Sequence, residues 1–362
     1  MNEIFNIISS FPVNQAPLKG SVSWESPSNI ALVKYWGKYG VQLPKNASIS
    51  MCLSKAYTIT SIQYKYTRSA PKRSFLFEGK PTEKFAQRIW KYLDSLTSIY
   101  PFLQQLDLHI ESENSFPHSA GIASSASSMS ALALCLVDME RQLFGHLQNQ
   151  VDFLKKASHI ARLGSGSAAR SVFGGYSIWG ENKTIDLESD NRYALDFNST
   201  IHPFFQGIQD AILIVDENEK AVSSSLGHSL MNNHPFANNR LSQANNHISA
   251  ITKALQEADK ESFIKIVEAE AMSLHALMMS SEPWFILIKP QTISIIEQIR
   301  KYRQETGKFI TFTLDAGPNV HLLYHKDDEL EIKHFIKHKL QAYCSQQKIL
   351  FDGMGSGPKK TN

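Results

Sequence analysis

A run of small and hydroxyl-bearing residues, FPHSAGIASSASSMS at 116–130, leads directly into the apolar-periodic segment ALALCLVDMERQLF. Apolar residues recur at helical spacing from Met129 to Val137, with Glu140 on the polar border, which predicts an amphipathic helix. A helix N-terminus leaves backbone N–H groups unpaired, and its dipole favours negative charge there. A preceding backbone without bulky side chains lets an anion reach those groups. The stretch therefore predicts either an N-capping loop or a cradle for phosphate.

Within this loop, Ala120 and Gly121 keep the backbone accessible, and Ser124, Ser125 and Ser127 supply hydroxyl groups. Such hydroxyls hold phosphate oxygens or the magnesium of a bound nucleotide. The loop has neither the GK[ST] of a Walker A loop nor a GxGxxG fingerprint, so these two nucleotide-binding loops are excluded.

A second stretch, NIALVKYWGK at 29–38, places Lys34 and Lys38 four residues apart around Tyr35 and Trp36. Two lysines beside aromatic residues are typical of a surface where aliphatic stems cover the rings. The alternative is an anion site, in which the two ammonium groups bind a diphosphate and Tyr35 donates a phenolic hydrogen bond.

Two further stretches carry groups suited to chemistry. GSGSAAR at 164–170 supplies Ser165, Ser167 and the planar fork of Arg170, which suits a carboxylate or a phosphate, or is simply a helix terminus. TLDAGPN at 313–319 places Asp315 after an apolar strand, where an aspartate either caps its own turn or acts as a base.

The loop resembles the phosphate-binding loop of the galactokinase, homoserine kinase, mevalonate kinase and phosphomevalonate kinase (GHMP) superfamily. The four stretches, in this order, closely resemble the diphosphomevalonate decarboxylase family over about residues 23–357. The resemblance implies a homodimer that phosphorylates the 3-hydroxyl of mevalonate 5-diphosphate with ATP and Mg²⁺. Loss of phosphate and carbon dioxide then yields isopentenyl diphosphate.

The resemblance also implies a role for each candidate residue. Asp315 accepts the 3-hydroxyl proton, Lys34 lies beside it and favours its ionised form, and Arg170 binds the C1 carboxylate. The substrate-binding residues implied are Tyr35, Lys38, Ser165, Ser167 and, more loosely aligned, Ser224 and Ser225. The ATP-binding residues implied are Ser119, Ala120, Gly121, Ser124, Ser125 and Ser127. His118 and Ser119 depart from the family's usual loop.

Three alternatives remain within and beyond this resemblance. Mevalonate 3-kinases phosphorylate without decarboxylating, but they lack the aspartate–lysine pair that Lys34 and Asp315 supply. A decarboxylase of mevalonate 5-phosphate stays open, because that choice depends on pocket depth around Tyr35 and Lys38. A non-catalytic ATP-binding paralogue is expected to have lost one of these residues.

The resemblance implies an α+β fold with two lobes. An N-terminal extension at 1–20 precedes a ribosomal-protein-S5-like lobe at 21–195 with the phosphate loop, and a ferredoxin-like lobe follows at 196–362. The periodicities agree with a mixed fold. They predict helices at 83–96, 151–164, 238–257, 260–280, 293–307 and 332–347, and strands at 57–64, 106–112 and 211–216, at both ends of 309–325, and at KILFDG. The site is expected where the lobes meet.

Composition excludes several partners. The net charge of +3 is too small to indicate nucleic acid, and no apolar run reaches the length of about 18 residues that crosses a membrane. Three scattered cysteines without a CxxC pair indicate neither disulfides nor zinc, and the N-terminus is a poor signal peptide, so a cytoplasmic protein is expected. His334 and His338 have metal-ligand spacing, but flanking lysines favour a solvated helix face, so no protein metal site is expected.

Overall fold

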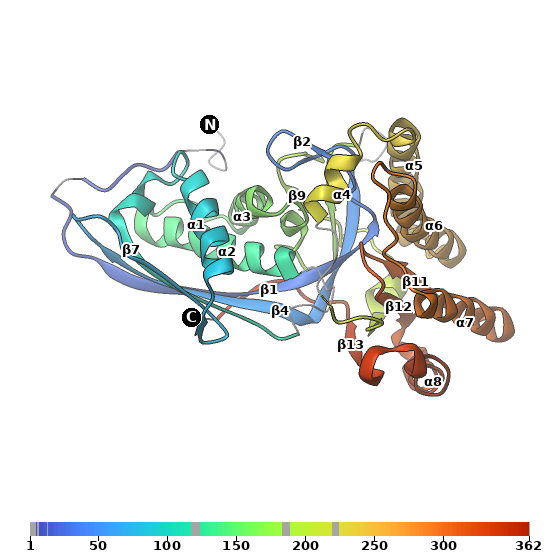
Figure 1. The fold of residues 1–362 in the computed structure, drawn as a ribbon. Helices are drawn as coiled ribbons and strands as arrows, with labels where there is room; N and C mark the ends of the chain where they lie inside the picture. Colours follow the sequence, from blue (N-terminus) through green and yellow to red (C-terminus); the bar gives the residue numbers. More distant parts are fainter. Residues whose placement is uncertain are drawn as a thin grey trace.

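Two β-sheets lie side by side, each covered by helices, and give the protein two lobes (Figure 1). The computed structural model describes residues 5, 7–12, 14–116, 124–182, 189–218 and 224–361, without the side chains of Ser224 and Ser225. This architecture confirms the predicted two-lobed α+β fold. The lobe boundary at residue 195 stays a prediction.

The larger sheet of the described chain has the order β14-β1-β4-β7-β5-β6, with β8 on β4 and β9 on β8. Its pairs are antiparallel except β5 with β7. The strands are β1 (Lys19–Val33), β4 (Ser48–Tyr66), β5 (Arg73–Phe77), β6 (Lys80–Pro81), β7 (Leu106–Asn114), β8 (Tyr176–Trp179), β9 (Ala194–Asp196) and β14 (Lys359–Lys360). The hairpin β2 (Lys38–Tyr39) and β3 (Leu43–Pro44) follows β1.

Strands β1 and β4 are long enough to reach from one lobe to the other. They pair from Lys19 opposite Lys65 to Val33 opposite Ile49. Their outer part packs in the first core, whereas Ile30 lies in a second core together with Ile212 of the smaller sheet. Continuous strands therefore carry Lys34, the residue after β1, to the junction between the lobes.

Helix α2 (Ser124–Phe144) is buried on nearly all sides, between the sheet and α3 (Gln150–Gly164), with α1 (Glu83–Ser95) nearby (Figure 1). Its small residues let it lie close to β1 and β4, where Ser130 Oγ and Ser26 Oγ are 2.5 Å apart. The predicted polar border is wrong, because Glu140 is buried and paired with Lys156 at 2.8 Å. An apolar helix of this kind belongs to the core rather than to the surface.

The smaller sheet has the order β11-β12-β10-β13 and is antiparallel throughout. Its strands are β10 (Ile208–Leu213), β11 (Ile310–Leu314), β12 (Val320–His325) and β13 (Ile349–Gly353). Helices α4 (Ser224–Leu230), α5 (Ala237–Glu257), α6 (Lys260–Met279) and α7 (Pro290–Thr306) come between β10 and β11, and α8 (Glu329–Phe335) between β12 and β13. This order and the two helical connections agree with the expected ferredoxin-like lobe.

Some predicted segments differ from the structure. The helix predicted at 332–347 is α8, a π-helical turn at Ile336–Leu340 and short 3₁₀ turns. The predicted N-terminal extension is partly core, since Ile8 and Phe11 are buried in the first lobe. The C-terminal β14 pairs with β1, so the chain returns to the first sheet at its end.

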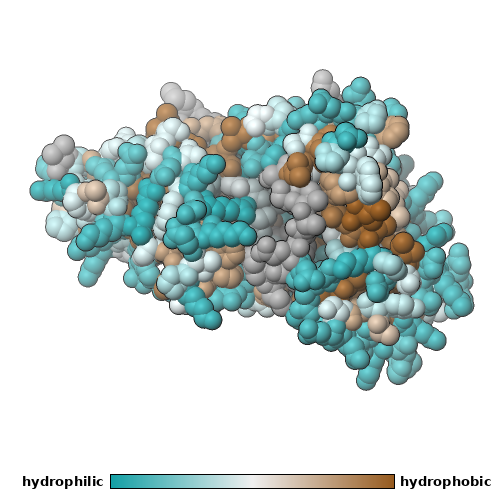
Figure 2. All heavy atoms as spheres, in the orientation of Figure 1, coloured by the Kyte–Doolittle hydropathy of each residue, from teal (hydrophilic) through white to brown (hydrophobic). Residues whose placement is uncertain are grey.

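The surface carries apolar side chains on the second lobe, visible as brown spheres on the right of Figure 2. Met272, Met279, Trp284, Ile286 and Ile293 are among the exposed large apolar residues of α6, α7 and the segment between them. No helix in the described ranges is both long and apolar enough to span a bilayer.

Candidate active site

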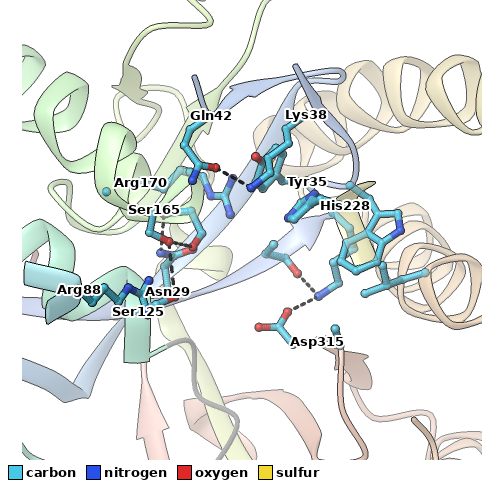
Figure 3. A pocket seen from close by; sticks show the side chains of 18 residues that line it. Asn29, Tyr35, Lys38, Gln42, Arg88, Ser125, Ser165, Arg170, His228 and Asp315 are labelled. Carbon is cyan, nitrogen blue, oxygen red and sulfur yellow. Dashed lines mark hydrogen bonds and ion pairs between the residues drawn. The ribbon is translucent and has the colours of Figure 1, made fainter. Parts of the chain in front are cut away.

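A cavity of about 470 Å³ opens where β1, α3, α4 and α6 meet the end of β11 (Figure 3). Eight of the residues implied by the resemblance line it: Lys34, Tyr35, Lys38, Ser125, Ser165, Ser167, Arg170 and Asp315. They come from segments up to about 280 residues apart, so only the folded chain brings them together. The candidate residues thus meet at the junction of the two lobes, where the site was expected, and their role as the active site stays a prediction.

Lys34 and Asp315 face each other across the lobe junction. Lys34 Nζ is 3.2 Å from Asp315 Oδ1 and donates a second hydrogen bond of 2.6 Å to Ala31 O. Burial lowers the pKa of the Lys34 ammonium, and the Asp315 carboxylate opposes that shift. The lysine side chain is 3% exposed and the aspartate side chain 26%, so the carboxylate is the more open of the two to the cavity that both line.

A buried ion pair fixes the backbone at Lys34. Glu270 of α6 accepts two hydrogen bonds of 2.6 Å from Arg240 of α5 and one of 2.8 Å from the Lys34 N–H. Burial alone would raise the pKa of Glu270, but hydrogen bonds from His247 and Arg240 outweigh it and lower the pKa to about 2. The helices of the second lobe therefore hold the segment that carries the ammonium.

We expect Glu270→Gln to lower the free energy of unfolding by about 3–5 kcal/mol, because Arg240 stays buried without a charge partner. Urea unfolding at neutral pH measures this loss. The folded-state pKa lies below the ordinary value of 4.5, so the carboxylate contributes stability above pH 4.5 and loses it as the pH falls toward 2. Wild type and variant are therefore expected to converge in acid.

Glu257→Gln is the control, since Glu257 and Lys253 form an exposed ion pair 3.9 Å apart. We expect it to leave the unfolding midpoint unchanged. Equal midpoints for Glu270→Gln and wild type would contradict the role given to the buried pair.

Arg170 lies in the wall of the cavity and is 2% exposed. Its Nε–H donates to Ser50 Oγ at 3.0 Å and its Nη1 to Ser48 Oγ at 2.5 Å, both on β4. Burial lowers the pKa of the guanidinium to about 10, and the nearby Asp315 opposes the shift. Two serines thus orient the fork and leave its other N–H groups for a ligand in the cavity.

Tyr35 and Lys38 lie on the side of the cavity away from Asp315 (Figure 3). Burial raises the pKa of the Tyr35 hydroxyl, which has no hydrogen-bond partner within the described chain. Gly166 permits the close approach of Tyr35, because a Cβ there would lie 2.8 Å from the tyrosine ring. Lys38 Nζ donates to Gln42 Oε1 at 3.1 Å, and burial lowers its pKa.

Three serines form a row of hydroxyls along the same cavity. Ser165 Oγ is 3.4 Å from both Ser125 Oγ and Ser167 Oγ. Ser125 lies in the first turn of α2 and also borders a smaller, mostly apolar pocket of about 70 Å³, which Ser124, Phe75, Phe77 and other residues line. The start of α2 therefore lies between a polar cavity and an apolar one.

The remaining predicted residues divide into two groups. Ser127 does not line either pocket: it is fully buried, and its Oγ is 2.7 Å from Thr58 Oγ1 of β4. Its hydroxyl thus faces the sheet rather than the two pockets, and its contact with ATP stays a prediction without support from this geometry. Ser119, Ala120 and Gly121, like His118, lie outside the described residues, as do the side chains of Ser224 and Ser225.

The structure adds cavity residues that sequence reasoning missed. Arg88 of α1 lines both pockets, Asn29 donates to Ser171 Oγ at 2.7 Å, and His228 of α4 lies beside Tyr35. Arg88 appeared as one more polar residue of an amphipathic helix, and no local pattern separates it from Lys84 or Lys91. Asn29 begins the NIALVKYWGK stretch and His228 lies three residues after Ser225, and these positions were the only signal in the sequence.

The fold and the site define a GHMP-superfamily enzyme, with a phosphate-loop helix in one lobe and an acidic residue in the other. Residues 26–191 match the family described as the diphosphomevalonate decarboxylase-like N-terminal domain, and residues 211–359 match the mevalonate 5-diphosphate decarboxylase C-terminal domain. The chain belongs to the diphosphomevalonate decarboxylase family.

Similar proteins agree with this assignment. The diphosphomevalonate decarboxylase mvd1 of Aspergillus fumigatus is 30% identical over 84% of this chain and 77% of its own. The crystal structure of mevalonate diphosphate decarboxylase from Staphylococcus aureus has a TM-score of 0.81 at 28% identity, over 95% of this chain and 99% of that one. MDDEF in complex with MVAPP, AMPPCP and magnesium has a TM-score of 0.79 at 26% identity, over 95% and 100%.

Proposed function

We propose that this protein decarboxylates mevalonate 5-diphosphate in an ATP-dependent reaction that yields isopentenyl diphosphate. The observation that carries the proposal is the Lys34–Asp315 pair, 3.2 Å apart, in one cavity with Arg170. Asp315 orients a tertiary alcohol, Lys34 neutralises charge, and Arg170 binds a carboxylate. Family membership and the ligands of MDDEF support the same substrates.

In the first step, the 3-hydroxyl attacks the γ-phosphorus of ATP and its proton passes to Asp315. A tertiary alcohol is a poor nucleophile, so orientation and proton removal lower the barrier. Lys34 keeps the Asp315 carboxylate ionised and balances the charge that collects around the transferring phosphoryl group. Burial of the ammonium strengthens this interaction, because water screens it little.

In the second step, the 3-phosphate departs with the electrons of the C3–O bond. The C1–C2 bond then breaks, its electron pair forms the C2=C3 double bond, and carbon dioxide leaves. Arg170 holds the C1 carboxylate in its fork, with Ser48 and Ser50 fixing the orientation of that fork. The buried walls exclude water, which would otherwise capture the electron-poor carbon at C3.

The start of α2 fits a nucleotide and its magnesium. Ser124 and Ser125 carry hydroxyls there, the small pocket beyond them suits the apolar face of a base, and Arg88 supplies a cation between the two pockets. Within the described ranges no group of three or more His, Cys, Asp or Glu side chains could hold a metal. Phosphate oxygens and hydroxyls are the ligands that Mg²⁺ accepts in such sites, where it neutralises phosphate charge.

The activity test compares two substrates and three products. Purified protein is incubated with ATP, Mg²⁺ and either mevalonate 5-diphosphate or mevalonate 5-phosphate, and ADP, phosphate and carbon dioxide are measured. We expect the 5-diphosphate to give all three in equal amounts. ADP without carbon dioxide would favour a 3-kinase, turnover of the 5-phosphate alone would favour the sibling decarboxylase, and no ADP would favour a non-catalytic paralogue.

We also infer a cytoplasmic homodimer. Its support is the family resemblance together with Cys52, Cys135 and Cys344, which are buried free thiols and fit a reducing compartment. Sedimentation equilibrium tests the dimer.

A further inference from the structure

His228 is a buried histidine that neither the sequence motifs nor the proposed mechanism uses. It belongs to the short helix α4, lines the cavity and is 7% exposed. Its ring centroid is 4.2 Å from that of Tyr35 and 4.8 Å from that of Trp36. The preceding Gly227 lets α4 approach Trp36, since a Cβ there would lie 2.5 Å from the indole. The imidazole therefore has one closely packed position.

Its hydrogen bonding determines which ring nitrogen carries the proton. His228 Nδ1 accepts a hydrogen bond of 3.0 Å from the Gly37 N–H, so Nδ1 is unprotonated. Burial, followed by the charges of Lys38 and Arg170, lowers the pKa of His228 to about 3. The ring is then neutral at ordinary pH, and Nε2 carries the hydrogen.

The Nε2–H group is a donor that the described chain leaves without a partner. The neighbouring Tyr35 hydroxyl is buried and likewise without one. Buried donors are normally satisfied, and an unpartnered tyrosine hydroxyl beside an imidazole N–H in the wall of a cavity indicates a ligand with several acceptor oxygens. Figure 3 shows His228 beside Tyr35, on the part of the cavity that also holds Lys38.

We propose that His228 donates its Nε2–H to a phosphate oxygen of the substrate's 5-diphosphate and thereby selects the 5-diphosphate over the 5-phosphate. This inference rests on the proposed function and extends it to substrate choice. A 5-phosphate lacks the second phosphoryl group, so a donor placed for that group stays without an acceptor. Sites built to hydrogen-bond a group discriminate strongly against analogues that lack it.

A neutral donor suits this position for an electrostatic reason. Lys34, Lys38 and Arg170 already line the cavity as cations, and a charged imidazole would add repulsion when no substrate is bound. A hydrogen bond from the neutral N–H depends on geometry and adds no charge. The donor therefore recognises the position of a phosphate oxygen and not only its negative charge.

Two variants separate the cavity donor from the contact with Gly37. The amide of glutamine reaches about as far as Nε2, so His228→Gln keeps a donor in the cavity. Asparagine is shorter and reaches only about as far as Nδ1, so His228→Asn keeps the acceptor for Gly37 and removes the cavity donor. Both lose the ring contacts with Tyr35 and Trp36 equally, which makes each the control of the other.

The measurement is kcat/KM for mevalonate 5-diphosphate and for mevalonate 5-phosphate, after wild type is shown to turn over at least one of them. In His228→Asn we expect a loss of about tenfold or more for the 5-diphosphate, mainly in KM, and less than about threefold for the 5-phosphate. We expect His228→Gln to stay within about threefold of wild type for both.

Other outcomes overturn the inference. A larger loss in His228→Gln than in His228→Asn would make the Gly37 contact the role of this histidine. Equal losses for both substrates would indicate a general packing role, and no loss in either variant, or a wild type that prefers the 5-phosphate, would remove the role in selection. A wild type that turns over neither substrate would instead refute the proposed function.

Discussion

Asp315→Asn is expected to lower kcat by about 10² or more, which is the scale for losing a general base. The binding of ATP and substrate is expected to stay nearly unchanged. Asparagine has the size of aspartate and keeps the turn in which Gly317 N–H donates to the carbonyl of residue 315 at 2.7 Å. It cannot accept the 3-hydroxyl proton, and it removes the charge that faces Lys34. Single-turnover kinetics measure the phosphoryl-transfer step, and calorimetry measures binding.

The control is Lys34→Met, alone and combined with Asp315→Asn. Because the two groups act as one unit across the lobe junction, the double variant is expected to lose much less than the product of the single losses. A loss of only a few-fold in Asp315→Asn would contradict the base role. Fully multiplicative losses would mean that the two residues act independently.

Arg170→Lys is expected to lower kcat/KM by about 10². The guanidinium holds Ser48 and Ser50 with one edge and leaves its other N–H groups for the substrate. An ammonium keeps the charge but cannot make both sets of bonds, because it lacks the planar fork. Because Arg170→Lys keeps the charge, the loss in its kcat/KM relative to wild type measures the lost geometry. Circular dichroism checks that both proteins are equally folded.

Ser50→Ala is the matched control for this variant, since it removes one orienting contact and leaves the guanidinium in place. We expect a loss that is clearly smaller than for Arg170→Lys. Unchanged kinetics in Arg170→Lys would refute the assignment of the C1 carboxylate to this residue.

Much of the fold was predictable from periodicity and motif order. The helix expected at 83–96 is α1, and the strands expected at the ends of 309–325 are β11 and β12. Local patterns did not predict that β1 and β4 extend between lobes or that Ile8 packs in the first core, because both depend on partners distant in the sequence. Glu140 was expected on the polar border of its helix for the same reason, because the sequence does not show its buried partner, Lys156.

The candidate residues that share one cavity are those in recognisable stretches, as for Lys34, Arg170 and Asp315. The sequence did not show that the Ser127 hydroxyl faces the sheet, because a serine in a helix's first turn can point toward either a ligand or the sheet. Arg88 was missed because only the fold places α1 and the start of α2 around the same pockets. The type of a residue indicates the chemistry that it can do, but it says less about the direction in which its side chain points.

The most direct test of the account follows the oxygen of the substrate's 3-hydroxyl. Mevalonate 5-diphosphate labelled with ¹⁸O at that hydroxyl is turned over with ATP and Mg²⁺, and the released inorganic phosphate is analysed by mass spectrometry. If Asp315 and Lys34 direct phosphorylation of the tertiary alcohol, the released phosphate carries the label, one ¹⁸O per phosphate. Unlabelled phosphate alongside labelled water would mean that the hydroxyl leaves without being phosphorylated, and would contradict the account.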